Sequence, residues 1–143
     1  MELSTYKKYF ALSYDQFVEL NKSHISKIVE DVRYEKINNV TRVDLPDNQF
    51  FFFNNSALKM IYISGETVVN KVWNEFKSTA DVSVPEKRVR SRAGKTSNQL
   101  IFATRGITAS ITKDDVNFIE LYPPCSLEDY LEKIYIEPGP FIR

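Results

Sequence analysis

Four consecutive phenylalanines, Phe50 to Phe53, constrain the fold more than any other part of the chain. Successive side chains of an extended strand point to opposite faces of a sheet, so this strand carries aromatic rings on both faces. Such a strand is either central and covered on both sides, or it gives one face to a partner. Turn residues at Pro46 to Asn48 and at Asn54-Asn55 limit the predicted strand to residues 49–53.

Alternating apolar and polar residues predict further strands on either side of this one. They lie at residues 40–45, 57–63, 84–93, 100–103, 107–112 and 116–122. Short turns separate most of them, which is typical of antiparallel neighbours. The predicted fold class is therefore α+β, with a largely antiparallel sheet of about seven strands and helices packed on one face.

Three segments show apolar residues at helical spacing. The first is Ser13 to Lys36, which begins with a capping box of Ser13 and Gln16. A break of this helix near residues 21–23 stays open. The second is Glu66 to Ser78, and a short third helix begins at Ser126. After this third helix, prolines and a glycine predict an extended strap that runs to the end of the chain.

The chain of 143 residues fits a single domain, residues 1–143. Within it, a helix followed by strands occurs twice, in residues 13–63 and 65–122, before a C-terminal helix and tail at 126–143. A short match between Gln49-Phe50-Phe51-Phe52 and Gln99-Leu100-Ile101-Phe102 supports two repeats. Because neither half can bury its apolar face alone, we interpret the chain as two tandem helix-plus-meander units.

This order of elements resembles the tandem repeats of the beta-lactamase-inhibitor-protein family and of the related outer-membrane assembly lipoproteins. The resemblance covers most of the chain and consists of the element order. It implies a concave sheet that grips another protein. It transfers no functional role to any individual residue.

The segment from Lys87 to Lys95 carries five cationic residues in nine. If residues 84–93 are extended, alternate side chains share one face, about 6.6 Å apart. This places three arginines in a row: Arg88, Arg90 and Arg92. Guanidinium groups in a row suit carboxylates or phosphates, because each offers a planar fork of donors.

The same arginines have a second interpretation, as part of a cross-strand charge ladder inside the protein. The last predicted hairpin can bring Asp114, Asp115 or Glu120 near them. A phosphate-binding loop at Gly94-Lys95-Thr96 is excluded, because the pattern G-x-x-x-x-G-K-[ST] requires a second glycine five residues before Gly94. This chain has Val89 at that position.

Nineteen basic and nineteen acidic residues cancel, so no overall field marks a nucleic acid or a membrane surface as the partner. One cysteine, Cys125, and one histidine, His24, form no internal disulfide and no metal cluster of standard spacing. The apolar runs are too short to span a bilayer, and the N-terminus lacks a signal-peptide layout. We expect a soluble cytoplasmic protein with no metal and no cofactor.

The leading hypothesis is a non-catalytic module that binds another protein, such as a small inhibitor or an immunity protein that blocks an enzyme or toxin. Arginine and aromatic residues are enriched at interface hot spots. The candidate partner-binding residues are Arg88, Arg90, Arg92, Lys95, Phe53 and Tyr62. No catalytic residue is predicted, since adjacent carboxylates point apart and Cys125 follows two prolines.

Two alternatives stay open. The basic strand 87–95 can bind nucleic acid, with Phe51 or Phe102 stacking on bases, although a pI near 6.6 is low for that role. A small-ligand or enzymatic site can also be assembled from residues far apart in the sequence, which no local pattern reveals.

Overall fold

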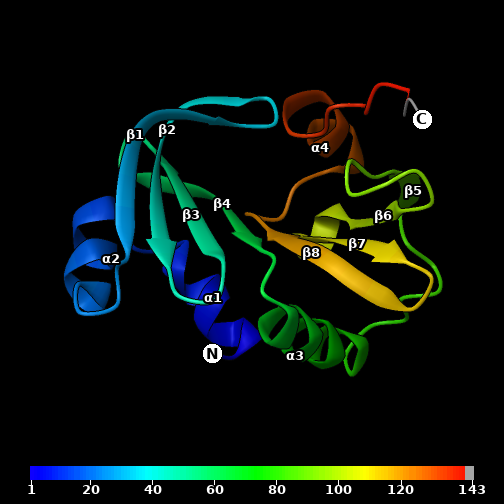
Figure 1. The fold of residues 1–143 in the computed structure, drawn as a ribbon, viewed down its shortest axis with the longest axis horizontal. Coiled ribbons are helices and arrows are strands. Elements are labelled where there is room, and N and C mark those ends of the chain that lie inside the picture. The colour runs from blue at the N-terminus through cyan, green and yellow to red at the C-terminus, as the bar shows by residue number, and fades with distance from the viewer. Residues whose placement is uncertain (141–143) are drawn as a thin grey trace.

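The computed structural model describes residues 1–140, and one eight-stranded antiparallel sheet organises them (Figure 1). The strands are β1 Lys27–Tyr34, β2 Ile37–Leu45, β3 Gln49–Asn54, β4 Ala57–Ile63, β5 Lys87–Arg90, β6 Asn98–Phe102, β7 Ile107–Thr112 and β8 Asp115–Leu121. The helices are α1 Leu3–Tyr9, α2 Tyr14–Asn21, α3 Glu66–Lys77 and α4 Leu127–Lys133, with a 3₁₀ turn at Ala103–Arg105. The predicted α+β class with an antiparallel sheet is confirmed.

The sheet consists of two meanders, β1 to β4 and β5 to β8, joined through the last strand of each in the order β1-β2-β3-β4-β8-β7-β6-β5. A helix precedes each meander, α2 the first and α3 the second. At the junction Tyr62 of β4 faces Glu120 of β8, with one further pair on either side. An antiparallel pair has local two-fold symmetry, so Tyr62 and Glu120 occupy equivalent positions at the centre of the sheet.

This topology corrects the sequence match between the two predicted units. Counting outward from the junction, β3 corresponds to β7, whereas residues 99–102 belong to β6. The match of residues 49–52 with residues 99–102 therefore joins strands that are not equivalent. The first half also contains four strands where three were predicted.

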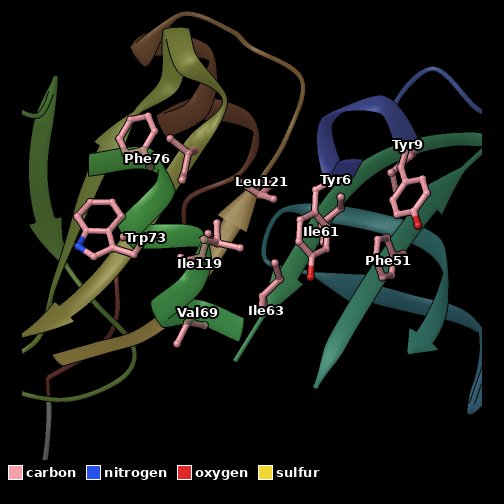
Figure 2. Packing of buried hydrophobic residues seen from close by; sticks show 14 of the residues in the cluster. Tyr6, Tyr9, Phe51, Ile61, Ile63, Val69, Trp73, Phe76, Ile119 and Leu121 are labelled. Atoms are coloured by element: carbon pink, nitrogen blue, oxygen red, sulfur yellow. The ribbon is translucent and has the colours of Figure 1, made fainter. Parts of the chain in front are cut away.

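Helices α1, α2 and α3 cover one face of the sheet and enclose its main core (Figure 1). Figure 2 shows Tyr6 and Tyr9 of α1 near Phe51 of β3, in the first-meander half of the core. Trp73 of α3 lies in the other half, together with Ile119 of β8. Burial of such rings and branched chains is the main source of stability in a fold of this kind.

The opposite face carries a second, smaller core beneath α4, in which Tyr130 and Ile134 pack with Met60 and Ile101. Three helices thus share the predicted face, and α4 covers part of the other. The β1–β2 turn reaches α4, because the Lys36 amide donates a hydrogen bond of 3.2 Å to the Ile134 carbonyl.

The four phenylalanines divide between these two faces as their alternation predicts. Phe51 and Phe53 belong to the core under the three helices, and Phe52 belongs to the core near α4. Phe50 shares the face of Phe52 and is only half-buried, packed at the margin of the smaller core. The strand is therefore central in the first meander, with its α4 face partly open.

The predicted helix Ser13 to Lys36 is wrong beyond Asn21. Its capping box is present, since Ser13 and Gln16 exchange both expected hydrogen bonds, but α2 ends at Asn21 and residues 27–34 form β1. The strand contains a bulge between Val29 and Val32, where Asp31 has a φ of 56°. A bulge adds one residue to a strand, so apolar side chains recur at a spacing of three and imitate a helix.

The predicted strap after α4 lies partly outside the described residues. Residues 135–140 form neither helix nor strand, and residues 141–143 are not described. Within residues 1–140, no helix combines the length and the apolar character needed to cross a membrane.

Gly65 sits where the start of α3 meets the β2–β3 turn, and a Cβ there would lie 2.2 Å from the Asp47 carbonyl oxygen. We expect Gly65→Ala to lower the free energy of unfolding by about 1–3 kcal/mol, because the turn and helix must move apart. Urea denaturation measures this. Gly139→Ala is the matched control, since a Cβ at Gly139 meets nothing within 4 Å. Equal stability of the two variants would contradict the close approach.

Candidate functional site

Glu120 is the one acidic side chain that is almost completely buried among the described residues, at 1% exposure. Its carboxylate lies on the α4 side of the sheet and receives two tyrosine hydroxyls, one on each oxygen. Tyr130 of α4 donates to Oε1, and Tyr34 at the end of β1 donates to Oε2. Strands β1 and β8 and helix α4 therefore meet at one carboxylate.

The Arg92 guanidinium completes this cluster from the β5–β6 connection. Its Nη1 lies 3.2 Å from a Glu35 oxygen and 3.8 Å from Glu120 Oε2, and its Nη2 donates to the Tyr34 hydroxyl at 2.8 Å. The guanidinium carbon is 4.4 Å from the centroid of the Phe118 ring, a distance typical of a cation–π contact. Arg92 is thus held by carboxylates, a hydroxyl and an aromatic ring.

The chain turns sharply to place Arg92 there. The Ser91 amide donates to the Ser97 carbonyl at 3.1 Å, which closes the turn directly after β5. The Ser91 hydroxyl lies 2.6 Å from the Ser110 hydroxyl and accepts a hydrogen bond from the Ala93 amide. These bonds anchor the turn to β7.

Burial and the neighbouring groups together set the protonation of the cluster. Burial raises the pKa of Glu120, although Arg92 and the two tyrosine hydroxyls act in the opposite direction. Burial, reinforced by Glu120, raises the pKa of Tyr34 and of Tyr130 well above the ordinary value, so both hydroxyls remain proton donors. Burial acts to lower the pKa of Arg92, but Tyr34 and Glu120 outweigh it, and the pKa is raised. The guanidinium therefore keeps its charge.

Beside this cluster, the sheet face that α4 leaves open contains a hollow of about 240 Å³, which we call the arginine–aromatic hollow. Its lining residues are Tyr34, Arg42, Phe50, Phe52, Tyr62 and Arg92. Arg42 stands 5.3 Å from the Phe50 ring centroid and donates twice to Asp44, at 2.7 and 3.0 Å. The side chains of both arginines are about a third exposed, at 30% and 32%.

The predicted row of three arginines does not form. The strand is shorter than expected and ends at Arg90, whose guanidinium donates to the carbonyls of Pro138 and Gly139 at 3.1 Å. Arg88 is exposed and pairs in register with Leu100, on the side of the three helices. Arg92 lies beyond the strand on the other face and meets Glu120, which is one of the carboxylates that the charge-ladder interpretation named.

The other predicted binding residues are also separated. Tyr62 lines the hollow and is half-buried, whereas Phe53 is buried in the main core at 2% exposure and does not reach the surface. Lys95 is exposed in the β5–β6 turn. Phe51 and Phe102, the rings proposed for base stacking, are both buried in the main core.

Local sequence patterns missed Tyr34, Arg42, Phe50 and Tyr130 as members of one site. Tyr34 fell inside the wrongly predicted helix, and the others lie on three different elements. One signal was present. Glu120 is a charged residue in a strand whose other residues from 118 to 121 are Phe, Ile and Leu, and such a residue needs a partner when buried.

A larger hollow of about 500 Å³ lies beside α4, with a mainly apolar lining that includes Tyr122, Cys125 and Ile134. Burial raises the pKa of the Cys125 thiol, which favours its protonated form. His24 is exposed between α2 and β1, far along the chain from Cys125. In residues 1–140, no group of three His, Cys, Asp or Glu side chains is placed to hold a metal ion.

Comparisons of the chain with protein-family models, with curated proteins and with solved structures give no match.

We expect Glu120→Ala to lower the free energy of unfolding by about 3–5 kcal/mol, because it removes a buried partner from Arg92 and from two tyrosine hydroxyls. Chemical denaturation at pH 7 measures the change. Glu132→Ala, at an exposed position of α4, is the matched control and is expected to change stability by less than about 0.5 kcal/mol. A small effect at Glu120 would show that the cluster does not hold these elements together.

The pH dependence of Glu120→Gln tests the raised pKa of Glu120. In the folded protein this carboxyl keeps its proton at pH values somewhat above 4.5, its ordinary pKa, whereas the carboxyl of the unfolded chain has lost its proton there. The stability of the wild type relative to Glu120→Gln is therefore greatest below pH 4.5 and falls as the pH rises through the folded pKa. Denaturation midpoints across this range check the sign. A relative stability that increases with pH would mean that the pKa is lowered.

Proposed function

We propose that this protein is a non-catalytic binding module whose arginine–aromatic hollow contacts another protein, in the manner of a small inhibitor or an immunity protein. The observation that carries the proposal is the lining of the hollow. All six residues are arginine, tyrosine or phenylalanine, and arginine and the aromatic residues are enriched where binding energy concentrates at interfaces.

Preorganisation of the hollow supports this function. Asp44 holds Arg42 through two hydrogen bonds, and Glu35 with Glu120 holds Arg92. A side chain that is already ordered loses little conformational entropy when a partner binds. The buried cluster beneath the hollow therefore has a role in binding as well as in stability.

The surroundings of the hollow suit a larger contact. A stable protein interface covers about 800 Å² on each partner. A hollow of about 240 Å³ is too small to form such an interface alone, so we place it at the centre of a larger contact. The strand register places Lys27 beside Asp44 and Val29 beside Arg42, which extends the same face along β1. An aromatic centre with a mixed polar rim is the usual organisation of a hot spot.

The geometry favours binding over chemistry at Glu120. Both of its oxygens accept hydrogen bonds from tyrosine hydroxyls, and the residue is buried, so the carboxylate is occupied within the protein. The nucleic-acid alternative has less support. The exposed arginine row is absent, and the rings proposed for stacking are buried.

Site-specific photo-cross-linking in the native host tests the proposal. We expect a benzoyl-phenylalanine placed at Phe50, in the hollow, to give one discrete cross-linked protein. The same probe at Lys22, an exposed position at the end of α2, is expected to leave that protein unlinked. Tyr62→Ala in the Phe50 probe protein removes a hollow side chain and is expected to reduce the yield by about tenfold.

Three results would contradict the proposal: no adduct at Phe50, the same adduct from both probe positions, or an adduct with RNA or DNA in place of protein. The last result would favour the nucleic-acid alternative. Circular dichroism of each purified probe protein confirms that the fold is retained.

A further inference from the structure

We infer that the occupant of the arginine–aromatic hollow is a single aromatic side chain of the partner, inserted beside Arg42 and Arg92. This inference rests on the proposed function and adds the chemistry of the group that is bound. The hollow is small. Pockets for drug-sized ligands measure roughly 300–1,000 Å³, and this hollow of about 240 Å³ is smaller, with room for one large side chain.

The charges around the hollow disfavour an anion. Arg42 is matched by Asp44, and Arg92 by Glu35 and Glu120. A phosphate or carboxylate entering the hollow must compete with these groups for the guanidinium donors and is repelled by them. The two arginines therefore do not form an anion site, although two arginines without acidic neighbours would favour one.

The same geometry disfavours a cation. A lysine or arginine of the partner would seek the faces of the aromatic rings. The guanidinium carbon of Arg42 already stands 5.3 Å from the Phe50 centroid, and that of Arg92 stands 5.5 Å from the Tyr62 centroid. Guanidinium groups of the protein therefore already occupy these ring faces, and an incoming cation would have to displace one of them.

A neutral ring meets neither penalty. The planar guanidinium groups of Arg42 and Arg92 stack favourably on aromatic faces. Phe50 and Tyr62, with ring centroids 5.9 Å apart, supply ring edges and faces for offset or edge-to-face contacts. An aromatic side chain is also the anchor that interface hot spots most often use.

Titration of the purified 143-residue protein with N-acetyl-tryptophanamide tests this inference by NMR. The arginine Nε–Hε signals of Arg42 and Arg92 are expected to shift upfield and to saturate, because a ring beside a guanidinium produces a ring-current shift. Inorganic phosphate and N-acetyl-glutamate amide, at the same concentrations and ionic strength, are expected to leave these two signals without a saturable shift.

Two variants localise the binding. Tyr62→Ala and Phe50→Ala are expected to weaken binding of the tryptophan amide by about three- to tenfold, as expected for the loss of one aromatic contact. Arg88→Ala, an exposed arginine on the other side of the sheet, is the control and is expected to leave it unchanged. The amide NMR spectrum of each variant confirms its fold.

Saturable shifts with phosphate, or no saturable shift with the tryptophan amide, would overturn the inference. These outcomes are separate from failure of the proposed function. A protein cross-linked at Phe50 together with no binding of the amide means that the partner is real and its contact is not aromatic. Binding of the amide without any cross-linked protein means that the hollow accepts aromatic groups but that protein binding is wrong.

Discussion

The hydrogen bonds to the Glu120 carboxylate are the interactions on which the α4 side of this structure depends. The two carboxylate oxygens receive the hydroxyls of Tyr34, from the first meander, and Tyr130, from the C-terminal helix. Hydrophobic burial supplies most of the stability of a fold, but it has no direction. Directional hydrogen bonds inside a core specify which elements meet. In residues 1–140 every fully buried polar side-chain atom has a partner, as a well-specified polar core requires.

The open part of the sheet follows from this arrangement. Tyr34, at the end of β1, bonds to Glu120, and the β1–β2 turn contacts α4. These elements cover part of the sheet face on the α4 side. Phe50 and Tyr62 remain half-buried at the edge of the covered region, next to Arg92. Tyr34 and Arg92 belong both to the Glu120 cluster and to the lining of the arginine–aromatic hollow. A change in the cluster is therefore expected to alter the shape of the hollow.

Local patterns predicted the elements that have regular periodicity. The strand at residues 57–63, the helix that begins at Glu66 and the capping box at Ser13 all appear in the structure. Residues 25–34 were assigned to a helix because the bulge at Asp31 changes the spacing of apolar residues from two to three. The arginine row failed for a related reason. A turn ends β5 after Arg90, and strand alternation cannot be extended through a turn.

The sequence by itself determined the α+β class, most strand positions and the two-sided character of residues 50–53, because these depend on side-chain alternation along a short stretch of chain. Only the tertiary structure decided that Arg92 meets Glu120, and that Tyr34 and Tyr130 share the same carboxylate. These contacts depend on β8 lying beside β4, and on the β1–β2 turn reaching α4. Such pairings join residues up to 86 positions apart, and no periodicity within one element records them.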